Sequence, residues 1–432
     1  MSISLVGLAL LAVSPVAPSS RSAAPVAAPL VGLQGEITLP ELIDLLETRS
    51  PAYKAVLHQV DGAKARITAA KVLPNPTIGL SLLYLNQGFN QNGVATYFAT
   101  VSLPVLIAGQ RRWRVRTAKA GVDAVAADVH VQHQAYVHIA CALFVSQQAA
   151  QERIQVLNAA LAEIAALDAR QPNAGNLYSV RVNFEVSRLR ARLAETETSV
   201  HDMAGRLGVL LGLPELSAHA VGPLTQLGIS GTPGLLWNEF KNTHPAVEAA
   251  RRTELYTLKR VDLARRERWP TPSVSVGTVA IQNYYSISTF VGLSVPVPMF
   301  DWGQGQIAGA SADNQRATLE TKSVELESEA QLHRLFRRLE HRRRALQTFE
   351  ADVLVTVPAM QRLAGEAAQG GRPEVAIDIT MTLFNVKLSH IDKIEALVRA
   401  ELDVLAAAGR IETAVNQPPS ASSPAHSKIV DE

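Results

Sequence analysis

Two stretches of the chain alternate apolar with small or polar residues at a period of two. In the first, Ile78, Leu80, Leu82 and Tyr84 alternate with Thr, Gly, Ser and Leu, and the pattern resumes after a polar loop. The second stretch shows the same alternation on both sides of its own turn. This periodicity is typical of β-strands with two unlike faces. It predicts two β-hairpins, at residues 74–104 and 270–297.

Both hairpins fall in regions without charge. Residues 72–110 and 269–300 contain no Asp, Glu, Lys or Arg, although 19% of the whole chain is charged. A buried soluble core is one explanation. Strands of about ten residues with one apolar and one small or polar face also suit a transmembrane barrel, in which lipid contacts one face and water the other. The candidate lipid-facing residues are Leu80, Val291 and Leu293.

A period of seven follows the first hairpin. An apolar residue recurs at every seventh position from Val115 to Ile164, which is typical of a coiled-coil seam. A continuous helix over residues 109–170 would be about 90 Å long. The chain then meets a turn containing Gly175, and a shorter returning helix is predicted over residues 179–211.

The second hairpin is followed by the same rhythm. Leucine, valine or methionine recurs every seven residues over 332–360. The predicted helix, residues 303–369, is interrupted at Pro358, because proline lacks a backbone donor and clashes with the preceding turn. Gly370 and Gly371 mark the next turn, and a returning helix is predicted over 374–415.

The two halves therefore repeat one unit. Four landmarks recur in the same order at nearly constant spacing: Pro51 and Pro245, Pro76 and Pro272, Pro104 and Pro296, and Gly109 and Gly303. Spacing this long indicates duplication of one large unit rather than a solenoid. We predict a first repeat at 29–236 and a second at 237–415. Residues 1–28 resemble a signal peptide, and the Pro/Ser-rich residues 416–432 are predicted to be disordered.

Composition narrows the function further. The formal net charge of +2 creates no long-range field that would attract nucleic acid. The basic run at 334–344 interleaves with leucines at core spacing, which favours a helical face over a nucleic-acid patch. Cys141 is the single cysteine, so neither a disulfide framework nor a structural zinc site is expected. No His, Met or Cys cluster has metal-ligand spacing, and no cofactor is expected.

An enzyme, a periplasmic scaffold and a membrane channel would require different features of the sequence. An enzyme is disfavoured because the sequence lacks a phosphate loop, a nucleophile elbow and an HExxH motif. A periplasmic adaptor or coiled-coil scaffold without channel activity would explain the heptads. Such a protein would not need two charge-free hairpins with alternating faces. The hairpins therefore favour a membrane channel.

The order of helix, hairpin, long helix, glycine turn and returning helix, present twice, resembles TolC-like outer-membrane efflux proteins. Local motifs carry the same resemblance: Leu73-Pro74-Asn75-Pro76 before the first hairpin, Phe300-Asp301-Trp302-Gly303 after the second, and Leu210-Leu211-Gly212-Leu213-Pro214 at the end of the first repeat. The likeness covers about residues 37–410. The LPNP-bearing form leans towards the metal-efflux branch of the family.

This resemblance implies an α+β membrane protein. Three copies would each supply four strands to one twelve-stranded transmembrane β-barrel and long helical hairpins to an α-barrel that extends into the periplasm. Such a homotrimer lies in the outer membrane of a Gram-negative bacterium, in contact with its lipid. It acts as the passive exit duct of a tripartite efflux or secretion system, joined by a periplasmic adaptor protein and an inner-membrane pump.

The resemblance also suggests where such a channel closes. Family members place acidic residues just beyond the second glycine turn, and here the corresponding candidates are Glu374 and Asp378. Arg372 lies beside them in sequence, and Arg181 lies beyond the first turn. These four residues are the predicted periplasmic gate. Helix-start charges without a gating role are the alternative.

Overall fold

The computed structural model describes residues 35–85, 94–169, 176–213, 219–222, 224, 227, 229, 232–281, 286–370 and 372–411. The predicted signal peptide and the predicted disordered tail lie outside these residues. The described helices are α1 (Leu39–Arg49), α2 (Pro51–Lys71), α3 (Gln110–Ala169), α4 (Asn176–Leu211), α5 (Pro233–Phe240), α6 (Pro245–Glu267), α7 (Gln304–Asp352), α8 (Val357–Gln369) and α9 (Pro373–Ala407).

The strands form two sheets. They are β1 (Glu36–Ile37), β2 (Thr77–Leu85), β3 (Val94–Pro104), β4 (His219–Ala220), β5 (Ser273–Ile281) and β6 (Ser286–Ser294). Strands β2, β3, β5 and β6 make an antiparallel sheet in that order, so the two predicted hairpins lie side by side. β1 and β4 form a short parallel pair.

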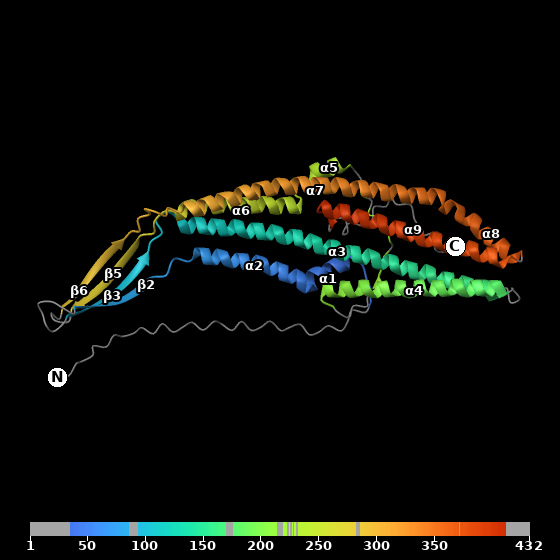
Figure 1. The fold of residues 1–432 in the computed structure, drawn as a ribbon, viewed down its shortest axis with the longest axis horizontal. Coiled ribbons are helices and arrows are strands. Elements are labelled where there is room, and N and C mark those ends of the chain that lie inside the picture. Colours follow the sequence, from blue (N-terminus) through green and yellow to red (C-terminus); the bar gives the residue numbers. More distant parts are fainter. Residues whose placement is uncertain are drawn as a thin grey trace, which may run out of the picture.

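The molecule is elongated, with the four-stranded sheet at one end and the helices extending away from it (Figure 1). α3 packs along α2, α4, α6 and α9, while α7 packs along α6 and α9. The ends of α3, α4, α8 and α9 lie at the end of the molecule opposite the sheet (Figure 1). Among the described helices, none combines the length and the apolar character needed to cross a membrane.

Several residues of the seven-residue pattern are buried between the helices. Leu157 and Ile164 of α3 are buried against α4 and α9, and Leu332, Leu339 and Leu346 of α7 are buried in a second cluster with α9. Full burial of a leucine side chain contributes about 1.5–3 kcal/mol. The heptad pattern thus marks the positions that hold the hairpins together.

The predicted break in the second long helix is confirmed. α7 ends at Asp352, a 3-10 turn covers Leu354–Thr356, and α8 begins at Val357. Pro358 lies in the first turn of α8, where its missing N–H would have had no helical partner. The break therefore falls just before the proline, on the residues that would otherwise clash with its ring.

Two helix boundaries differ from the sequence prediction. α4 begins at Asn176 rather than at residue 179. α9 ends at Ala407, well short of residue 415, because Gly409 adopts a left-handed conformation (φ +69°) that ends the helix. The Arg410 N–H then donates to the Leu405 carbonyl over 2.9 Å.

The first repeat closes in the same way. Gly212 has φ +72° and follows the end of α4, and the Leu213 N–H donates to the Gly208 carbonyl over 2.7 Å. Each glycine also packs on the proline that begins a helix of the same repeat. A Cβ added at Gly212 would lie 2.7 Å from Pro51 Cδ, and one at Gly409 would lie 2.5 Å from Pro245 Cδ.

The two long helices also begin alike, although the residues before them differ. Gly109 and Gly303 are both left-handed, with φ of +71° and +80°. The side chain of the next residue, Gln110 or Gln304, accepts a hydrogen bond from the N–H two positions earlier, over 3.1 Å and 3.0 Å. The same local geometry therefore connects β3 to α3 and β6 to α7.

Candidate channel wall and helix-end gate

The register of the four-stranded sheet separates two faces. Ile78 of β2 lies opposite Val101 of β3, Val101 opposite Val276 of β5, and Val276 opposite Val291 of β6. Directly paired residues project from the same side of a sheet, so one face is apolar across all four strands. This apolar sheet face consists of Ile78, Leu80, Leu82, Tyr84, Ala95, Tyr97, Ala99, Val101, Leu103, Val274, Val276, Thr278, Ala280, Ile287, Thr289, Val291 and Leu293.

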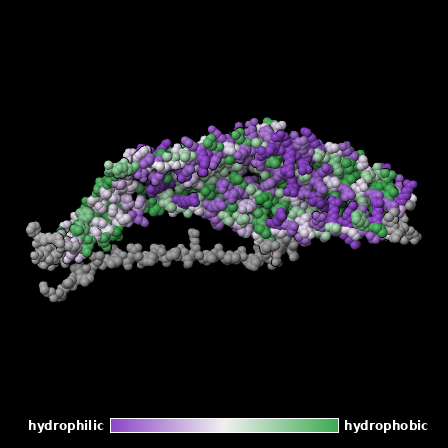
Figure 2. All heavy atoms as spheres, viewed as in Figure 1, coloured by the Kyte–Doolittle hydropathy of each residue, from purple (hydrophilic) through white to green (hydrophobic). Residues whose placement is uncertain are grey.

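The apolar sheet face is uncovered in the single chain. Leu80, Val291 and Leu293, the three predicted lipid-facing residues, are 75%, 75% and 71% exposed. Figure 2 shows hydrophobic and neutral colouring at the sheet end and more hydrophilic colouring along the helices. A sheet face this apolar and this exposed requires an apolar partner to be stable in water. Contact of these three residues with lipid remains a prediction.

The other face, called here the small-residue face, carries mostly small and hydroxyl residues, with larger apolar side chains such as Phe98 and Phe290 among them. Thr100 Oγ1 donates to the carbonyl of Gly79, its partner on β2, over 3.3 Å. Ser275 Oγ donates to the carbonyl of Gly292, its partner on β6, over 3.3 Å. In each hairpin, therefore, a side-chain hydroxyl donates to a backbone carbonyl of the paired strand. The described part of this face has no charged side chain.

The predicted gate residues gather at the end of the helices opposite the sheet. Arg181 of α4 forms an ion pair with Asp378 of α9. Both side chains are about half exposed, so solvent screens their attraction. Arg372 precedes the first residue of α9, and Glu374 lies in its first turn. The structure thus brings Arg181 and Asp378 together, while Arg372 and Glu374 lie at the start of α9.

The glycine turns are described in part. Gly370 follows α8, and its N–H donates to the Glu366 carbonyl over 2.8 Å. The Arg372 N–H donates to the Ala367 carbonyl over 3.0 Å, which reverses the chain towards α9. Gly175 and Gly371 lie outside the described residues.

A cavity of about 320 Å³ lies between α3, α4, α8 and α9 near the same end. Its buried floor includes Tyr178, Thr380 and Leu383, and its exposed rim includes Glu163 and Gln361. Within the described part of the chain, the Tyr178 hydroxyl has no hydrogen-bond partner. Burial raises the pKa of this hydroxyl, with a smaller contribution from Asp168. No local sequence pattern predicts this cavity, because its lining residues come from both repeats.

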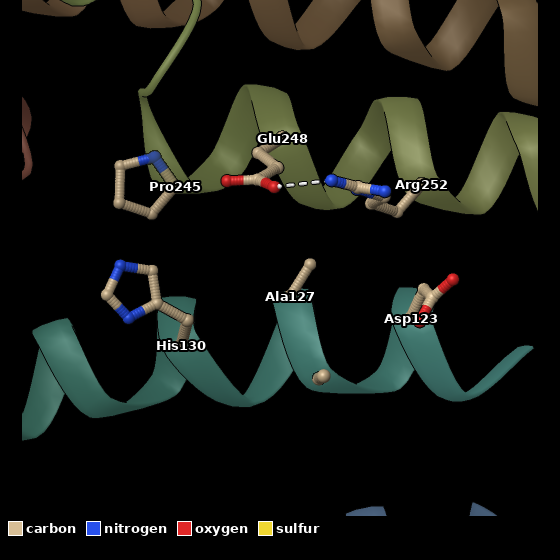
Figure 3. Close-up of a pocket in the computed structure, with 7 residues that line it drawn as sticks. Asp123, Ala127, His130, Pro245, Glu248 and Arg252 are labelled. Carbon is tan, nitrogen blue, oxygen red and sulfur yellow. Dashed lines mark hydrogen bonds and ion pairs between the residues drawn. The ribbon is translucent and has the colours of Figure 1, made fainter. Parts of the chain in front are cut away.

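A second cavity, of about 370 Å³, lies between α3 and α6. Figure 3 shows Asp123 and His130 on α3 facing Glu248 and Arg252 on α6. Glu248 and Arg252 form an ion pair over 3.2 Å. The described residues contain no group of three or more His, Cys, Asp or Glu side chains arranged to hold a metal ion. The seven-residue spacing of Asp123 and His130 places them on one helix face and could have signalled this groove.

Comparison with known proteins assigns the fold. The family model described as "Outer membrane efflux protein" matches residues 42–211. The cobalt-zinc-cadmium resistance protein CzcC of Cupriavidus metallidurans is 24% identical over 375 residues, covering 83% of this chain and 86% of CzcC. The outer-membrane channel OprN has a TM-score of 0.70 at 17% identity, covering 86% of this chain and 89% of OprN.

The open state of the Neisseria gonorrhoeae MtrE outer membrane channel gives a TM-score of 0.71 at 14% identity, over 86% of this chain and 89% of MtrE. Long helical hairpins joined to four antiparallel strands are the TolC-like fold. Residues 42–211 therefore match the model of the outer membrane efflux protein family, and the chain has the TolC-like fold. The matched family model and this fold describe a non-enzymatic outer-membrane efflux channel with a periplasmic helical extension.

Proposed function

We propose that three copies of this chain assemble into one closed channel. TolC-like channels are trimeric. In the single chain β2 and β6 are the edges of the sheet, and unpaired edges leave backbone groups unsatisfied in lipid. Pairing β6 of each copy with β2 of the next would close a barrel of twelve strands. The main support for this assembly is therefore the four-stranded sheet with one apolar face and two unpaired edges.

The channel would be the passive exit duct of a tripartite efflux system. An inner-membrane pump would supply the energy and a periplasmic adaptor would join the pump to the helix ends. The charge-free small-residue face would line the barrel and let varied solutes pass without binding them. This arrangement requires no cofactor.

Similarity to CzcC, a cobalt-zinc-cadmium resistance protein, makes divalent metal cations the first substrate class to test. The motif Leu73-Pro74-Asn75-Pro76 supports the same branch of the family. A strain that lacks the gene should become sensitive to cobalt, zinc or cadmium salts and recover when the gene is restored. Sensitivity to organic drugs alone would assign a different substrate class.

The assembly is tested by purification from outer membranes. A barrel protein should resist carbonate and leave the membrane only with detergent, and its mass in mild detergent should equal three chains. The purified protein should form conducting channels in planar bilayers. Release by carbonate, or a stable folded monomer, would instead support a periplasmic adaptor or scaffold.

A further inference from the structure

Basic residues and tryptophans gather where the helices meet the sheet. The last turn of α2, the first two turns of α3 and the last turn of α6 contain a single carboxylate, Glu267. We name the following residues the junction belt: Lys71, Arg111, Arg112, Arg114, Arg116, Arg265, Arg266 and Arg268, with Trp113, Trp269 and Trp302. These elements all end or begin beside the sheet (Figure 1).

Most cations of the junction belt have no anionic partner. Arg114 forms an ion pair with Glu267 over 2.9 Å. Arg116 and Arg266 instead lie 5.1 Å and 5.8 Å from the ring centre of Trp113. Within the part of the chain that the structure describes, no carboxylate lies within ion-pair distance of the other belt cations, which are exposed.

The fold alone does not account for this concentration of positive charge. α3 begins with Gln110, and its first turn carries Arg111 and Arg112 but no acidic residue. The N-terminus of a helix carries partial positive charge, so cations there are unfavourable. Seven arginines near one another also repel. An external anion would relieve both effects.

The belt lies next to the apolar sheet face. Leu103, Val274 and Leu293, which belong to that face, lie at the ends of their strands nearest the helices and are all exposed. If lipid chains cover this face, the headgroups of the same lipids lie at the level of the belt. Tryptophan is favoured at this boundary, and arginine binds phosphate through two parallel hydrogen bonds.

We propose that the junction belt binds the phosphate groups of anionic phospholipids in the membrane leaflet that faces the helices. This assignment rests on the proposed channel function, since it requires the sheet to lie in a bilayer. The exposed arginines would hold the phosphates, while Trp269 and Trp302, each about half exposed, would contact the glycerol and upper acyl region. The lipid would neutralise the charge at the start of α3 and fix the depth of the barrel.

The test is the quenching of tryptophan fluorescence by brominated lipids, with the assembled channel in vesicles. In one sample the phosphatidylglycerol is brominated and the phosphatidylcholine is not, and in the other sample only the phosphatidylcholine is brominated. The ratio of quenching in the two samples gives the relative affinity of the junction belt for the two lipids. The fourth tryptophan, Trp237, is buried on α5 away from the sheet. We expect phosphatidylglycerol to be preferred by about five-fold for one phosphate contact, and the preference to fall at high salt.

The triple variant Arg111→Gln, Arg112→Gln and Arg116→Gln should lose this preference, and the matching Arg→Lys variant should keep most of it. Arg334→Gln, Arg337→Gln and Arg342→Gln remove the same charge from exposed positions on α7 far from the sheet and should leave the preference unchanged. An equal preference in the belt variant and the native channel would overturn the proposal, as would equal losses in both triple variants.

If the belt variant does not assemble, the lipid preference of the native channel at low and high salt tests the proposal. A preference that does not change with salt would rule out phosphate binding by the arginines. Single-channel conductance is recorded for every preparation. A native channel that conducts but shows no lipid preference would overturn the belt and leave the channel function standing.

Discussion

Two glycines close the two repeats, and both should resist substitution. Gly212 and Gly409 are left-handed, and each lies against the ring of a helix-starting proline. Gly212→Ala and Gly409→Ala would impose both a strained backbone and an overlap with that ring. We expect each to destabilise the channel by about 2 kcal/mol or more. The yield of assembled channel and its thermal unfolding in detergent measure this loss.

Gly62→Ala supplies the matched control for these two substitutions. Gly62 lies inside α2, and a Cβ there would have nothing within 4 Å. Alanine at such a helix position should stabilise by about 0.5–1 kcal/mol. If Gly212→Ala were as harmless as Gly62→Ala, the packing of the repeat ends on Pro51 would contribute little to stability.

A buried histidine should make the channel less stable in mild acid. His244 Nε2 donates to the Ala407 carbonyl over 2.8 Å, while its buried Nδ1 has no partner among the described residues. Burial lowers the pKa of His244 below the usual value, against a smaller opposing effect of the Ala407 hydrogen bond. Below a pH of about 6.5 the unfolded chain therefore takes up the proton more readily than the folded chain, and stability falls as pH falls.

The unfolding temperature of the assembled channel, measured between about pH 7.5 and pH 5.5, tests this effect. His244→Gln, which can still donate to Ala407, should reduce the loss of stability in acid. His58→Gln removes an exposed histidine and should not change it. The same acid loss in His244→Gln as in the native channel would show that other groups cause it.

At the scale of elements, the strands were the most predictable part of the chain. An alternating pattern survives in the sequence only where each face of a sheet meets a different environment throughout. The predicted hairpins at 74–104 and 270–297 accordingly contain β2 with β3 and β5 with β6. Helix ends were less predictable, because the stop at Gly409 depends on one backbone conformation and not on periodicity.

The candidate site was predictable in composition but not in arrangement. The family resemblance pointed to Arg181 and Asp378, yet their ion pair joins residues almost two hundred positions apart. The cavity with Tyr178 and the groove with His130 likewise combine helices from both repeats. No local pattern encodes such contacts, since they depend on how the hairpins pack.

The two faces of the sheet should differ in their tolerance of charge. An arginine in place of Leu80, Val291 or Leu293 should cost about 2–4 kcal/mol near the middle of the bilayer and reduce assembled channel. Ser81 and Ser294 lie on the small-residue face, where arginine should be tolerated in a wet lumen. The amount of assembled channel in each variant is measured on gels by comparing the mobility of unheated and heated samples. If arginine were tolerated equally at the positions on the two faces, the apolar sheet face would not contact lipid.

In a trimer the ion pair between Arg181 and Asp378 would be present three times. Each copy carries one pair that joins the first-repeat hairpin to the second-repeat hairpin at the far helix ends. In the proposed trimer three such pairs would surround the periplasmic mouth. An exposed pair contributes at most about 1 kcal/mol. Three pairs would therefore favour closure by about 3 kcal/mol, or roughly a hundred-fold.

Substitution of each partner separates the ion pair from the charge of the ring. Asp378→Asn removes the pair and three negative charges, so single-channel conductance in planar bilayers should rise and block by divalent cations should weaken. Arg181→Gln removes the same pair but frees Asp378, so conductance should also rise while divalent block should strengthen. Glu374→Gln, in the first turn of α9, tests whether the neighbouring carboxylate contributes to block. If all three variants conduct and are blocked like the native channel, closure rests on the packing of the hairpin ends and not on these charges.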